Sequence, residues 1–420
     1  MLTNKNRDKV FVEIASYQTN KHKQVVCGDT FSSRKINGEN RYVAVLSDGL
    51  GSGIKANVLS TMTTSMALNY RMRHEPIVDS AISIMNALPI DSERGISYAT
   101  FSIVDIDFEG ETRIAEFDNP EFIFLCGTQQ IDPSKSLLYI NNDNEEFKIW
   151  DSENMPKEED LKDLVKVRKL KLTHLKLCKG DRIIIFSDGV SQAGMGTKAY
   201  PFGWNNKHIS DFIINLLRKK PDTSARDLSH RIVEEALAKD NYAAKDDITC
   251  SVIYSREPRY LLLVSGPPYD SQKDQALGKL VENYNGKKII CGGTTSKIIA
   301  RELKRDISVD IQSPLSRKYP PLAKIEGIDL ITEGILTLGA VSELLEQENI
   351  TENTEKSPAN LIVRMIMESD IIDLVIGTRI NEAHQDPSLP VELEIRRNVV
   401  KKISNLIEEK WLKKVNIQYI

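Results

Sequence analysis

The sequence predicts an α+β fold in two parts: a sandwich of antiparallel sheets flanked by helix pairs, followed by a smaller α/β domain. The first observation is the element order up to about residue 255, which reads strands, helix pair, strands, helix pair, strand, without regular βαβ alternation. The second is that strands and helices begin to alternate after Arg256-Glu257-Pro258. We therefore expect domains at 1–256 and 257–420, which suits a chain of 420 residues.

The first domain begins with strand patterns and then changes to helical periodicity. Strands are expected at 10–14, 25–27 and 42–46, with an Asn37-Gly38 turn among them. Two helices are expected between 52 and 88, with Pro76 opening the second. Strands follow at 98–106, 113–117, 122–125, 137–140, 170–177 and 182–186. Helices at 209–217 and 224–237, the latter capped by Asp222-Thr223, precede a last strand at 248–254.

The second domain is predicted to alternate strands with helices. Strands are expected at 260–264, 287–291, 328–331 and 371–376, and helices at 272–284, 295–303, 333–347, 358–368 and 391–409. The run Gly292-Gly293-Thr294-Thr295-Ser296 stands between a strand and a helix. A tight turn with a helix cap is the preferred interpretation, and a nest of backbone amides for an anion is the alternative. No Gly-Lys-Ser/Thr follows, so the Walker pattern is absent.

Composition and charge exclude several classes of function. The net charge of −4 provides no global basic field for nucleic acid or an anionic membrane surface. No run approaches the roughly 20 apolar residues of a membrane span, and the start lacks a signal-peptide pattern, so we expect a cytoplasmic protein. The 5 cysteines are widely spaced and the 6 histidines are scattered, which predicts reduced thiols and no zinc site. Any bound metal must be held by oxygen.

Two matching segments at strand ends carry the strongest chemical signal. Ser47-Asp48-Gly49 and Ser187-Asp188-Gly189 each place a carboxylate where an apolar strand ends. The glycine after each aspartate permits close approach of a ligand, and the Gly49 carbonyl could serve as a ligand beside Asp48. The plain alternative is a polar turn after each strand.

Two further acidic sites lie at strand ends. Asp29 follows Gly28 near the start of the chain, and Asp246-Asp247 precedes the last strand of the first domain. If these carboxylates converge, their mutual repulsion requires cations. Oxygen ligands favour Mg²⁺ or Mn²⁺, and two such ions about 4 Å apart could share and activate a water.

At these residues the chain resembles the bacterial SpoIIE-like branch of the PP2C (PPM) metal-dependent serine/threonine phosphatases, over about residues 9–255. The resemblance rests on the ordered segments Gly28-Asp29-Thr30-Phe31, Ser47-Asp48-Gly49-Leu50-Gly51-Ser52-Gly53, Tyr98-Ala99-Thr100-Phe101, Ser187-Asp188-Gly189-Val190 and Asp246-Asp247-Ile248-Thr249. It implies a β-sandwich between helix pairs with a binuclear Mn²⁺/Mg²⁺ centre.

The resemblance also implies roles for individual residues. Asp48 would bridge both metals, while Gly49 would offer its carbonyl to one of them and Asp29 would sit by the same metal through water. Asp188 and Asp246 would complete the other site, with Asp247 as a substitute for Asp246. Asp48, Asp188 and Asp246 are thus the expected catalytic residues.

Two departures from the family pattern affect the substrate side. Asp118-Asn119-Pro120 replaces the Gly-His-Pro turn of many relatives. The arginine that binds substrate phosphate in eukaryotic relatives has no clear match before Asp29, and His22 and Lys23 are interpreted as a solvated turn. The residue that orients the phosphate is therefore unassigned.

The leading hypothesis is a phosphatase that removes phosphate from serine or threonine of a phosphorylated protein. The second domain would govern partner choice, oligomerisation or sensing, and a homo-oligomer is left open. One alternative is an ATP-binding, kinase-like module that uses the loop Asp48–Gly53. The other is a non-catalytic module that binds phosphoprotein with the same fold.

Overall fold

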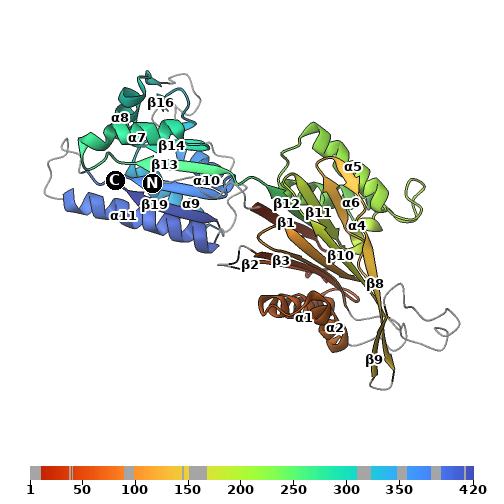
Figure 1. Cartoon of the computed structure of the whole chain (residues 1–420). Coiled ribbons are helices and arrows are strands. Elements are labelled where there is room, and N and C mark those ends of the chain that lie inside the picture. The colour runs from red at the N-terminus through yellow and green to blue at the C-terminus, as the bar shows by residue number, and fades with distance from the viewer. Residues whose placement is uncertain are drawn as a thin grey trace. The chain divides into compact units, whose positions relative to one another are not determined.

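The structure is a computed structural model that divides into two compact units, Met1–Glu257 and Pro258–Ile420 (Figure 1). It describes residues 11–36, 39, 41–88, 99–143, 146–150, 168–309, 323–347, 357–379, 389–410 and 413–420. The expected Asn37-Gly38 turn lies outside these residues. Each unit has its own hydrophobic clusters, so each is described by itself.

The first unit contains two antiparallel sheets. One has the order β1-β12-β11-β6-β7, formed by Phe11–Thr19, Ile248–Arg256, Asp181–Phe186, Ile123–Cys126 and Gln129–Ile131. The other has the order β2-β3-β4-β5-β10-β8-β9, formed by Thr30–Ile36, Arg41–Gly49, Ala99–Ile106, Glu111–Phe117, Arg168–Lys176, Lys135–Asp143 and Glu146–Trp150.

Alternation along the strands explains the four layers of this unit. In β3, Tyr42, Ala44 and Leu46 enter the core between the two sheets. Val43 and Val45 point to the other face, where they share a hydrophobic cluster with helices α1 (Ile54–Met72) and α2 (Ile77–Ala87). Helices α5 (Asn206–Lys219) and α6 (Ala225–Lys239) cover the outer face of the β1-β12-β11 sheet (Figure 1). The predicted sandwich flanked by helix pairs is confirmed.

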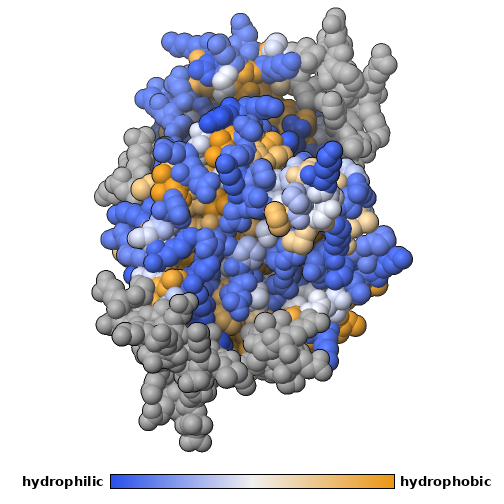
Figure 2. Space-filling model, turned by 90° about the vertical axis from the view of Figure 1, so that its right-hand side faces the viewer, coloured by the Kyte–Doolittle hydropathy of each residue, from blue (hydrophilic) through white to orange (hydrophobic). Residues whose placement is uncertain are grey.

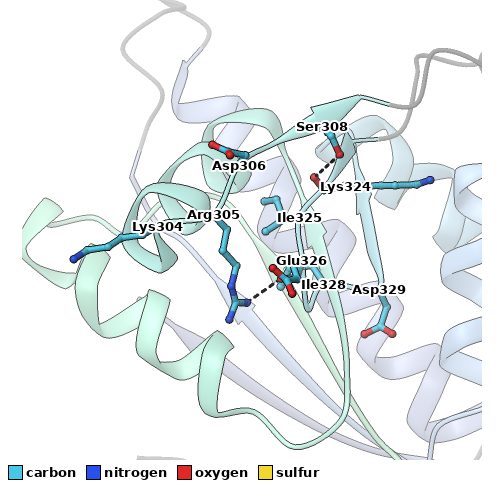
Figure 3. Close-up of a pocket in the computed structure, with 9 residues that line it drawn as sticks. All are labelled: Lys304, Arg305, Asp306, Ser308, Lys324, Ile325, Glu326, Ile328 and Asp329. Atoms are coloured by element: carbon cyan, nitrogen blue, oxygen red, sulfur yellow. Dashed lines mark hydrogen bonds between the residues drawn. The ribbon is translucent and has the colours of Figure 1, made fainter.

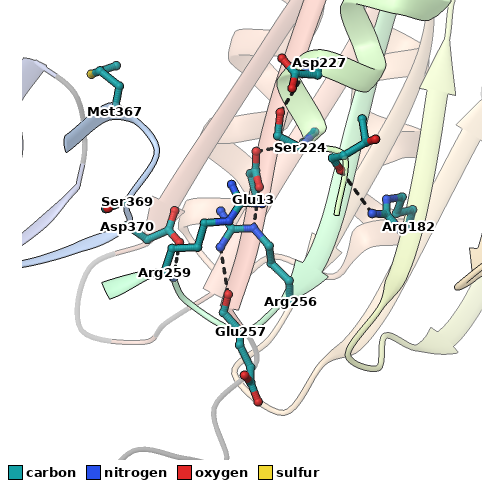
Figure 4. Close-up of polar contacts among 12 residues, drawn as sticks. Glu13, Arg182, Ser224, Asp227, Arg256, Glu257, Arg259, Met367, Ser369 and Asp370 are labelled. Carbon is teal, nitrogen blue, oxygen red and sulfur yellow. Dashed lines mark hydrogen bonds and ion pairs between the residues drawn. The ribbon is translucent and has the colours of Figure 1, made fainter. Parts of the chain in front are cut away.

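A partly buried carboxylate ties the first strand to the last strand and to α6. The Arg256 guanidinium donates from Nε to Glu13 Oε2 at 2.6 Å, and the Ala225 amide donates to Glu13 Oε1 at 3.0 Å (Figure 4). Arg256 also donates from Nη1 to the Glu257 carbonyl at 2.9 Å. Glu13 therefore holds the end of the unit and the first turn of α6 together.

The second unit is a parallel sheet covered by helices on both faces. Its order is β17-β14-β13-β18-β19, formed by Leu330–Thr332, Lys287–Cys291, Tyr260–Ser265, Ile371–Ile376 and Lys414–Tyr419. One face packs against α7 (Asp274–Asn283) and α8 (Gly293–Leu303), and the other against α9 (Ile335–Glu346), α10 (Pro358–Met367) and α11 (Leu389–Asn405). Short elements are η1 (Ser271–Lys273), η4 (Leu406–Lys410) and a ribbon of β15 (Ser308–Val309) with β16 (Ala323–Lys324). The predicted α/β domain is confirmed.

Several local predictions were wrong. Residues 25–27 form no strand, and β2 begins at Thr30 instead, because Val25 is 91% exposed and its carbonyl accepts from the Asn20 side chain at 3.0 Å. Helix α6 is capped by Ser224, whose hydroxyl accepts from the Asp227 amide, and not by Asp222-Thr223. The short strands β7, β9 and β19 were not expected from the sequence.

The face drawn in Figure 2 is mostly hydrophilic, with hydrophobic residues in small separate groups. Within the described ranges, no helix has both the length and the hydropathy needed to cross a bilayer. The 5 cysteines are all free thiols.

Candidate metal-dependent active site

The larger sheet brings Asp29 and Asp48 to the same end of the sandwich. Strand β2 pairs with β3 in the register Thr30 with Ser47, so Asp29, just before β2, lies beside Asp48. On its other side Asp48 pairs with Thr100 of β4. The strand pairing therefore brings the Asp29 and Asp48 carboxylates together.

The smaller sheet supplies the remaining acids. Asp188 follows β11 and opens the short helix α4 (Asp188–Ser191), while Asp246 and Asp247 directly precede β12. The two strand ends are joined because the Ser187 amide donates to the Thr249 carbonyl at 3.0 Å, and the Thr249 amide donates to the Ser187 hydroxyl at 3.0 Å. Asp188 and the Asp246-Asp247 pair thus lie side by side.

Contacts between the two sheets bring these acids into one cluster. The Gly28 amide, next to Asp29, donates to Asp247 Oδ2 at 3.0 Å. Asp48 lies within electrostatic range of Asp29, Asp188 and Asp246. The structure therefore places all the acids named from the sequence at one end of the sandwich.

Burial and crowding raise the pKa values of three of these acids. Burial raises the pKa of Asp29 to about 7, against an opposing effect of the Thr249 and Ser187 hydroxyls. Burial, and then the charge of Asp29, raises the pKa of Asp48 well above its usual range. Burial and the charge of Asp246 raise the pKa of Asp188. Without a cation, the site therefore resists full ionisation.

The chemistry of Asp29 fits a bound cation. Asp29 is 1% exposed, and both its carboxylate oxygens are buried. The Thr249 and Ser187 hydroxyls are close enough to lower its pKa, but no described residue reaches either oxygen with the geometry of a hydrogen bond. A buried carboxylate of this kind is costly unless positive charge compensates it. Across the described ranges, no three His, Cys, Asp or Glu side chains form a set that could hold one ion. Each ion would therefore also require backbone oxygen or water, as Mg²⁺ commonly does.

Asp246 and Asp247 have different surroundings. Both oxygens of Asp247 are engaged, because they accept from the amides of Lys21 at 2.9 Å and Gly28 at 3.0 Å. The Asp246 side chain is 42% exposed and lies 3.4 Å from the Lys21 ammonium. Asp246 is therefore the freer ligand, while Asp247 braces the Lys21 and Gly28 backbones.

Helix α1 supplies two polar side chains that sequence reasoning missed. Asn57 Nδ2 donates to the Cys27 carbonyl at 2.8 Å, and the Ser60 hydroxyl donates to the Gly28 carbonyl at 2.6 Å. The two bonds hold the backbone immediately before Asp29 against the helix. Their spacing of three residues on one helix face was the available signal.

The Asp118-Asn119-Pro120 turn supports the site indirectly, through hydrogen bonds to strand β4. Asn119 is buried and accepts from the Thr100 hydroxyl through Oδ1, while its Nδ2 donates to Ser102 Oγ at 3.1 Å. Thr100 is the strand partner of Asp48. Asn119 therefore helps to fix the strand that lies beside Asp48.

Two facing antiparallel sheets with acids gathered at one end define a phosphatase domain of the PP2C type, a metal-dependent class of serine/threonine phosphatases. The family model described as Stage II sporulation protein E (SpoIIE) matches residues 38–254, and the chain belongs to this family. No curated protein matches the chain. The family match favours the phosphatase hypothesis over an ATP-binding role for the loop Asp48–Gly53.

Solved structures with a similar arrangement are distant in sequence. The PP2C phosphatase domain with a regulatory-domain fragment of SpoIIE from Bacillus subtilis is 18% identical, with a TM-score of 0.44 over 59% of this chain and 65% of that chain. This chain therefore spans less than two thirds of that structure. RsbX in complex with magnesium is 19% identical, with a TM-score of 0.37 over 61% of this chain and 100% of that chain. The S. agalactiae serine/threonine phosphatase is 14% identical, with a TM-score of 0.38 over 59% of this chain and 100% of that chain.

Proposed function

We propose that the first unit hydrolyses phosphoserine or phosphothreonine on a protein substrate with the help of two Mn²⁺ or Mg²⁺ ions. The observation that supports this proposal is the meeting of carboxylates from both sheets around Asp29, whose buried oxygens have no partner among the described residues. Such a cluster is stable as an ionised group only with bound cations.

The residues present suggest how the ions would be held. Asp48 and the Gly49 carbonyl, with Asp29 through water, would hold one ion. Asp48, Asp188 and Asp246, together with water, would hold the other, because no three carboxylates of the described residues are placed to hold an ion by themselves. Ions bound there would supply a water of lowered pKa as nucleophile and neutralise charge on the phosphoryl group.

Neighbouring side chains keep these ligands in place. Gln192 Nε2 donates to Asp188 Oδ2 at 2.8 Å, which orients that carboxylate. Asp247 holds the Lys21 and Gly28 amides and so fixes the turn that carries Asp29. Outer contacts of this kind commonly set ligand orientation and affinity.

The exposed rim of the site suits a large substrate. The side chains of Asp246 and Lys21 are 42% and 36% exposed, so a residue on the surface of another protein can approach them. Lys21 adds a positive charge at this rim, which partly offsets the acids for an incoming phosphate.

The direct test is release of phosphate from a phosphoprotein and from p-nitrophenyl phosphate with Mn²⁺. We expect Asp48→Asn and Asp188→Asn to lower activity by at least about 100-fold, since each removes a ligand charge. Asp227→Asn, at an exposed position in the first turn of α6, is the matched control and should keep full activity.

Two results would decide against this proposal. Activity that survives in Asp48→Asn protein, or in excess EDTA, would exclude the metal-dependent reaction. Stoichiometric Mn²⁺ binding without turnover of any phosphorylated substrate would favour the non-catalytic binding module instead.

A further inference from the structure

Two glycine turns lie side by side at the carboxyl edge of the parallel sheet in the second unit. One is Gly292–Thr295 after β14, and the other is Glu333-Gly334 after β17; together we call them the paired turns. The strands pair in the register Cys291 with Thr332, and the Gly292 amide donates to the Thr332 carbonyl at 2.9 Å. A Cβ on Gly334 would lie 3.8 Å from Gly292 Cα.

Each of the paired turns opens a helix that has no side-chain cap. The N-cap residues are Gly292 for α8 and Gly334 for α9, and the helices have 11 and 12 residues. The first helical acceptors are the Gly292 and Gly334 carbonyls, bonded by the amides of Ser296 and Leu338. The amides before these have no acceptor within their own helix. Two helix N-termini, each with a partial positive charge, therefore lie next to one another.

The backbone of the first turn is open to a ligand. A Cβ on Gly293 would have no atom within 4 Å in the described part of the chain. Gly292 has φ +120°, a conformation that favours glycine. Among the described residues, no side chain therefore covers the backbone at Gly293.

Thr295 offers a side-chain donor at the first turn. The residue is 1% exposed, no described residue is hydrogen-bonded to its hydroxyl, and the hydroxyl oxygen is not fully closed off from solvent. The hydroxyl oxygen lies 3.3 Å from where a Cβ on Gly292 would be, so it faces the turn. Neighbouring hydroxyls are satisfied, since Ser296 donates to the Gly293 carbonyl at 2.8 Å and Thr332 to the Glu333 carbonyl at 3.0 Å.

The topology agrees with a ligand at this edge. The strand order moves outward from β13 first to β14 and β17 and then to β18 and β19, so the switch point, where sheets of this kind commonly bind ligands beyond their carboxyl ends, lies between β13 and β18. The paired turns lie at the same edge of the sheet, beside this point. Beside β13 and β18, a Cβ on Gly377 would lie 2.1 Å from the Pro267 carbonyl oxygen. The backbone of Pro267 therefore packs closely against Gly377, beyond the carboxyl ends of β13 and β18. Gly292 and Gly293 follow the neighbouring strand β14.

A cavity elsewhere in the unit does not compete with the paired turns. It has a volume of about 660 Å³ and lies where Asp329 precedes β17, at the amino end of that strand (Figure 3). Its charged lining mixes Lys304, Arg305 and Lys324 with Asp306, Glu326 and Asp329. Balanced charge at the amino edge of a parallel sheet identifies no ligand.

We propose that the paired turns bind the phosphate group of a small molecule. The amides of the two helix starts and the Thr295 hydroxyl would donate to phosphate oxygens. Lys297, exposed one turn into α8, adds positive charge, and the exposed Glu333 carboxylate is free to turn to solvent. This site is distinct from the acidic cluster of the first unit, and its ligand needs no metal.

The test is calorimetric titration of the full chain with inorganic phosphate, a nucleoside monophosphate and a phosphoserine peptide. Asp48→Asn protein in EDTA is used, so that the first unit contributes no metal-dependent binding. We expect one equivalent of phosphate or nucleotide to bind, with the nucleotide at least as tight as the peptide. No binding of any of the three at about 10 mM would overturn the proposal.

Variants locate the site. Thr294→Glu places a carboxylate at the exposed first turn of α8, where it repels an anion, so we expect at least about tenfold weaker binding. Thr295→Val removes the hydroxyl at nearly constant volume and should weaken binding about three- to tenfold. Gln347→Glu makes the same charge change at the exposed far end of α9 and should bind as the parent does.

Other outcomes contradict the proposal. Equal binding by Thr294→Glu and the Gln347→Glu control would exclude the paired turns as the site. Tighter binding of the phosphopeptide than of the nucleotide would show that the ligand is a protein segment and not a small molecule. Neither result depends on phosphatase activity, so both are independent of the function proposed for the first unit.

Discussion

Gly49 and Gly189 each follow an aspartate of the acidic cluster, and neither position has room for a side chain. A Cβ on Gly49 would lie 2.1 Å from the Ala56 carbonyl oxygen, and one on Gly189 would lie 2.1 Å from the Asp247 carbonyl oxygen. Both contacts are with backbone that cannot swing away. At the residue scale, the Asp-Gly pairs therefore let separate segments pack closely around the acids.

We predict that Gly189→Ala lowers the free energy of unfolding by roughly 1–3 kcal/mol, because the Asp247 backbone must move. Phosphatase activity should fall with it, since Asp247 braces the turn before Asp29. Urea unfolding and phosphate release measure the two effects. Gly339→Ala in α9, with no atom within 4 Å in the described chain, is the control and should stabilise by about 0.5–1 kcal/mol. Equal stabilities of the two variants would contradict the packing described here.

A buried acid outside the cluster gives stability a dependence on pH. Glu116 in β5 accepts from the Phe122 amide at 2.9 Å, and burial raises its pKa to about 7, against the opposing effects of that bond and of Lys171. The folded pKa lies above the unfolded value of 4.5. The protonated acid is therefore compatible with the fold, and stability is lost as the pH rises through the folded pKa.

We predict that Glu116→Gln removes this loss. Relative to the variant, the parent chain should lose roughly 2–3 kcal/mol of unfolding free energy between about pH 4.5 and pH 7, and little beyond. Denaturant unfolding in EDTA at pH 5 and pH 8 measures the difference. A constant difference between the two proteins at both pH values would show that Glu116 does not titrate in this range.

At the scale of elements, α1 connects the acidic cluster to the sheet. Near its start, Asn57 and Ser60 hold the Cys27 and Gly28 carbonyls. Near its end, Arg71 donates from Nε to Asp105 Oδ2 at 2.6 Å, and Asp105 is fully buried in β4. The helix is therefore fixed at both ends and can act as a support for Asp29.

We predict that Ser60→Ala raises the Mn²⁺ concentration for half-maximal activity about three- to tenfold, because Asp29 loses its support. The KM for p-nitrophenyl phosphate at saturating Mn²⁺ should change little. Lys55→Ala, on the exposed face of α1, is the matched control and should leave both values unchanged. A change in KM alone would indicate a role in substrate binding.

Regular elements could be predicted from sequence where one signal dominates. The apolar run of β3 and the helical spacing in α2 placed those elements correctly, because each buries a continuous apolar face. Helix α1 was also placed correctly, but its buried face is mostly small and polar, and the apolar side chains of Ile54, Val58 and Met62 are exposed. The strand predicted at 25–27 was wrong, because Val25 and Val26 lie in a loop and β-branched residues in a loop give the same signal as those in a strand. The edge strand β19, with mixed burial, lacks a clear pattern.

Asp48, Asp188 and the Asp246-Asp247 pair could be predicted because each stands at the end of a strongly apolar strand. Asp29 has no such signal, since residues 25–27 form no strand and β2 is polar, so it was identified only within the ordered family pattern. Their supports could not, because Asn57, Ser60 and Asn119 act through contacts with segments distant in sequence. The choice between Asp246 and Asp247 likewise depends on which backbone amides reach their oxygens.

At the scale of the whole molecule, the chain carries separate cores in its two units. Independent cores commonly unfold independently. Ligands that bind one unit then stabilise only that unit.

We predict two thermal transitions in scanning calorimetry. Mn²⁺ at a hundred times its Kd should stabilise the first unit by about 2.7 kcal/mol and raise the transition temperature of that unit only. Phosphate in EDTA should raise only the transition temperature of the second unit. Assignment follows from Asp48→Asn, which should abolish the shift caused by Mn²⁺. One cooperative transition that responds to both ligands would contradict independent units.

The central claim is that carboxylates from both sheets of the first unit hold two divalent ions. Anomalous diffraction from crystals grown with Mn²⁺ tests it most directly. We predict two peaks about 4 Å apart, with Asp48 between them and Asp29, Asp188 and Asp246 around them. Peaks elsewhere, or none at these acids with Mn²⁺ in excess, would contradict the claim.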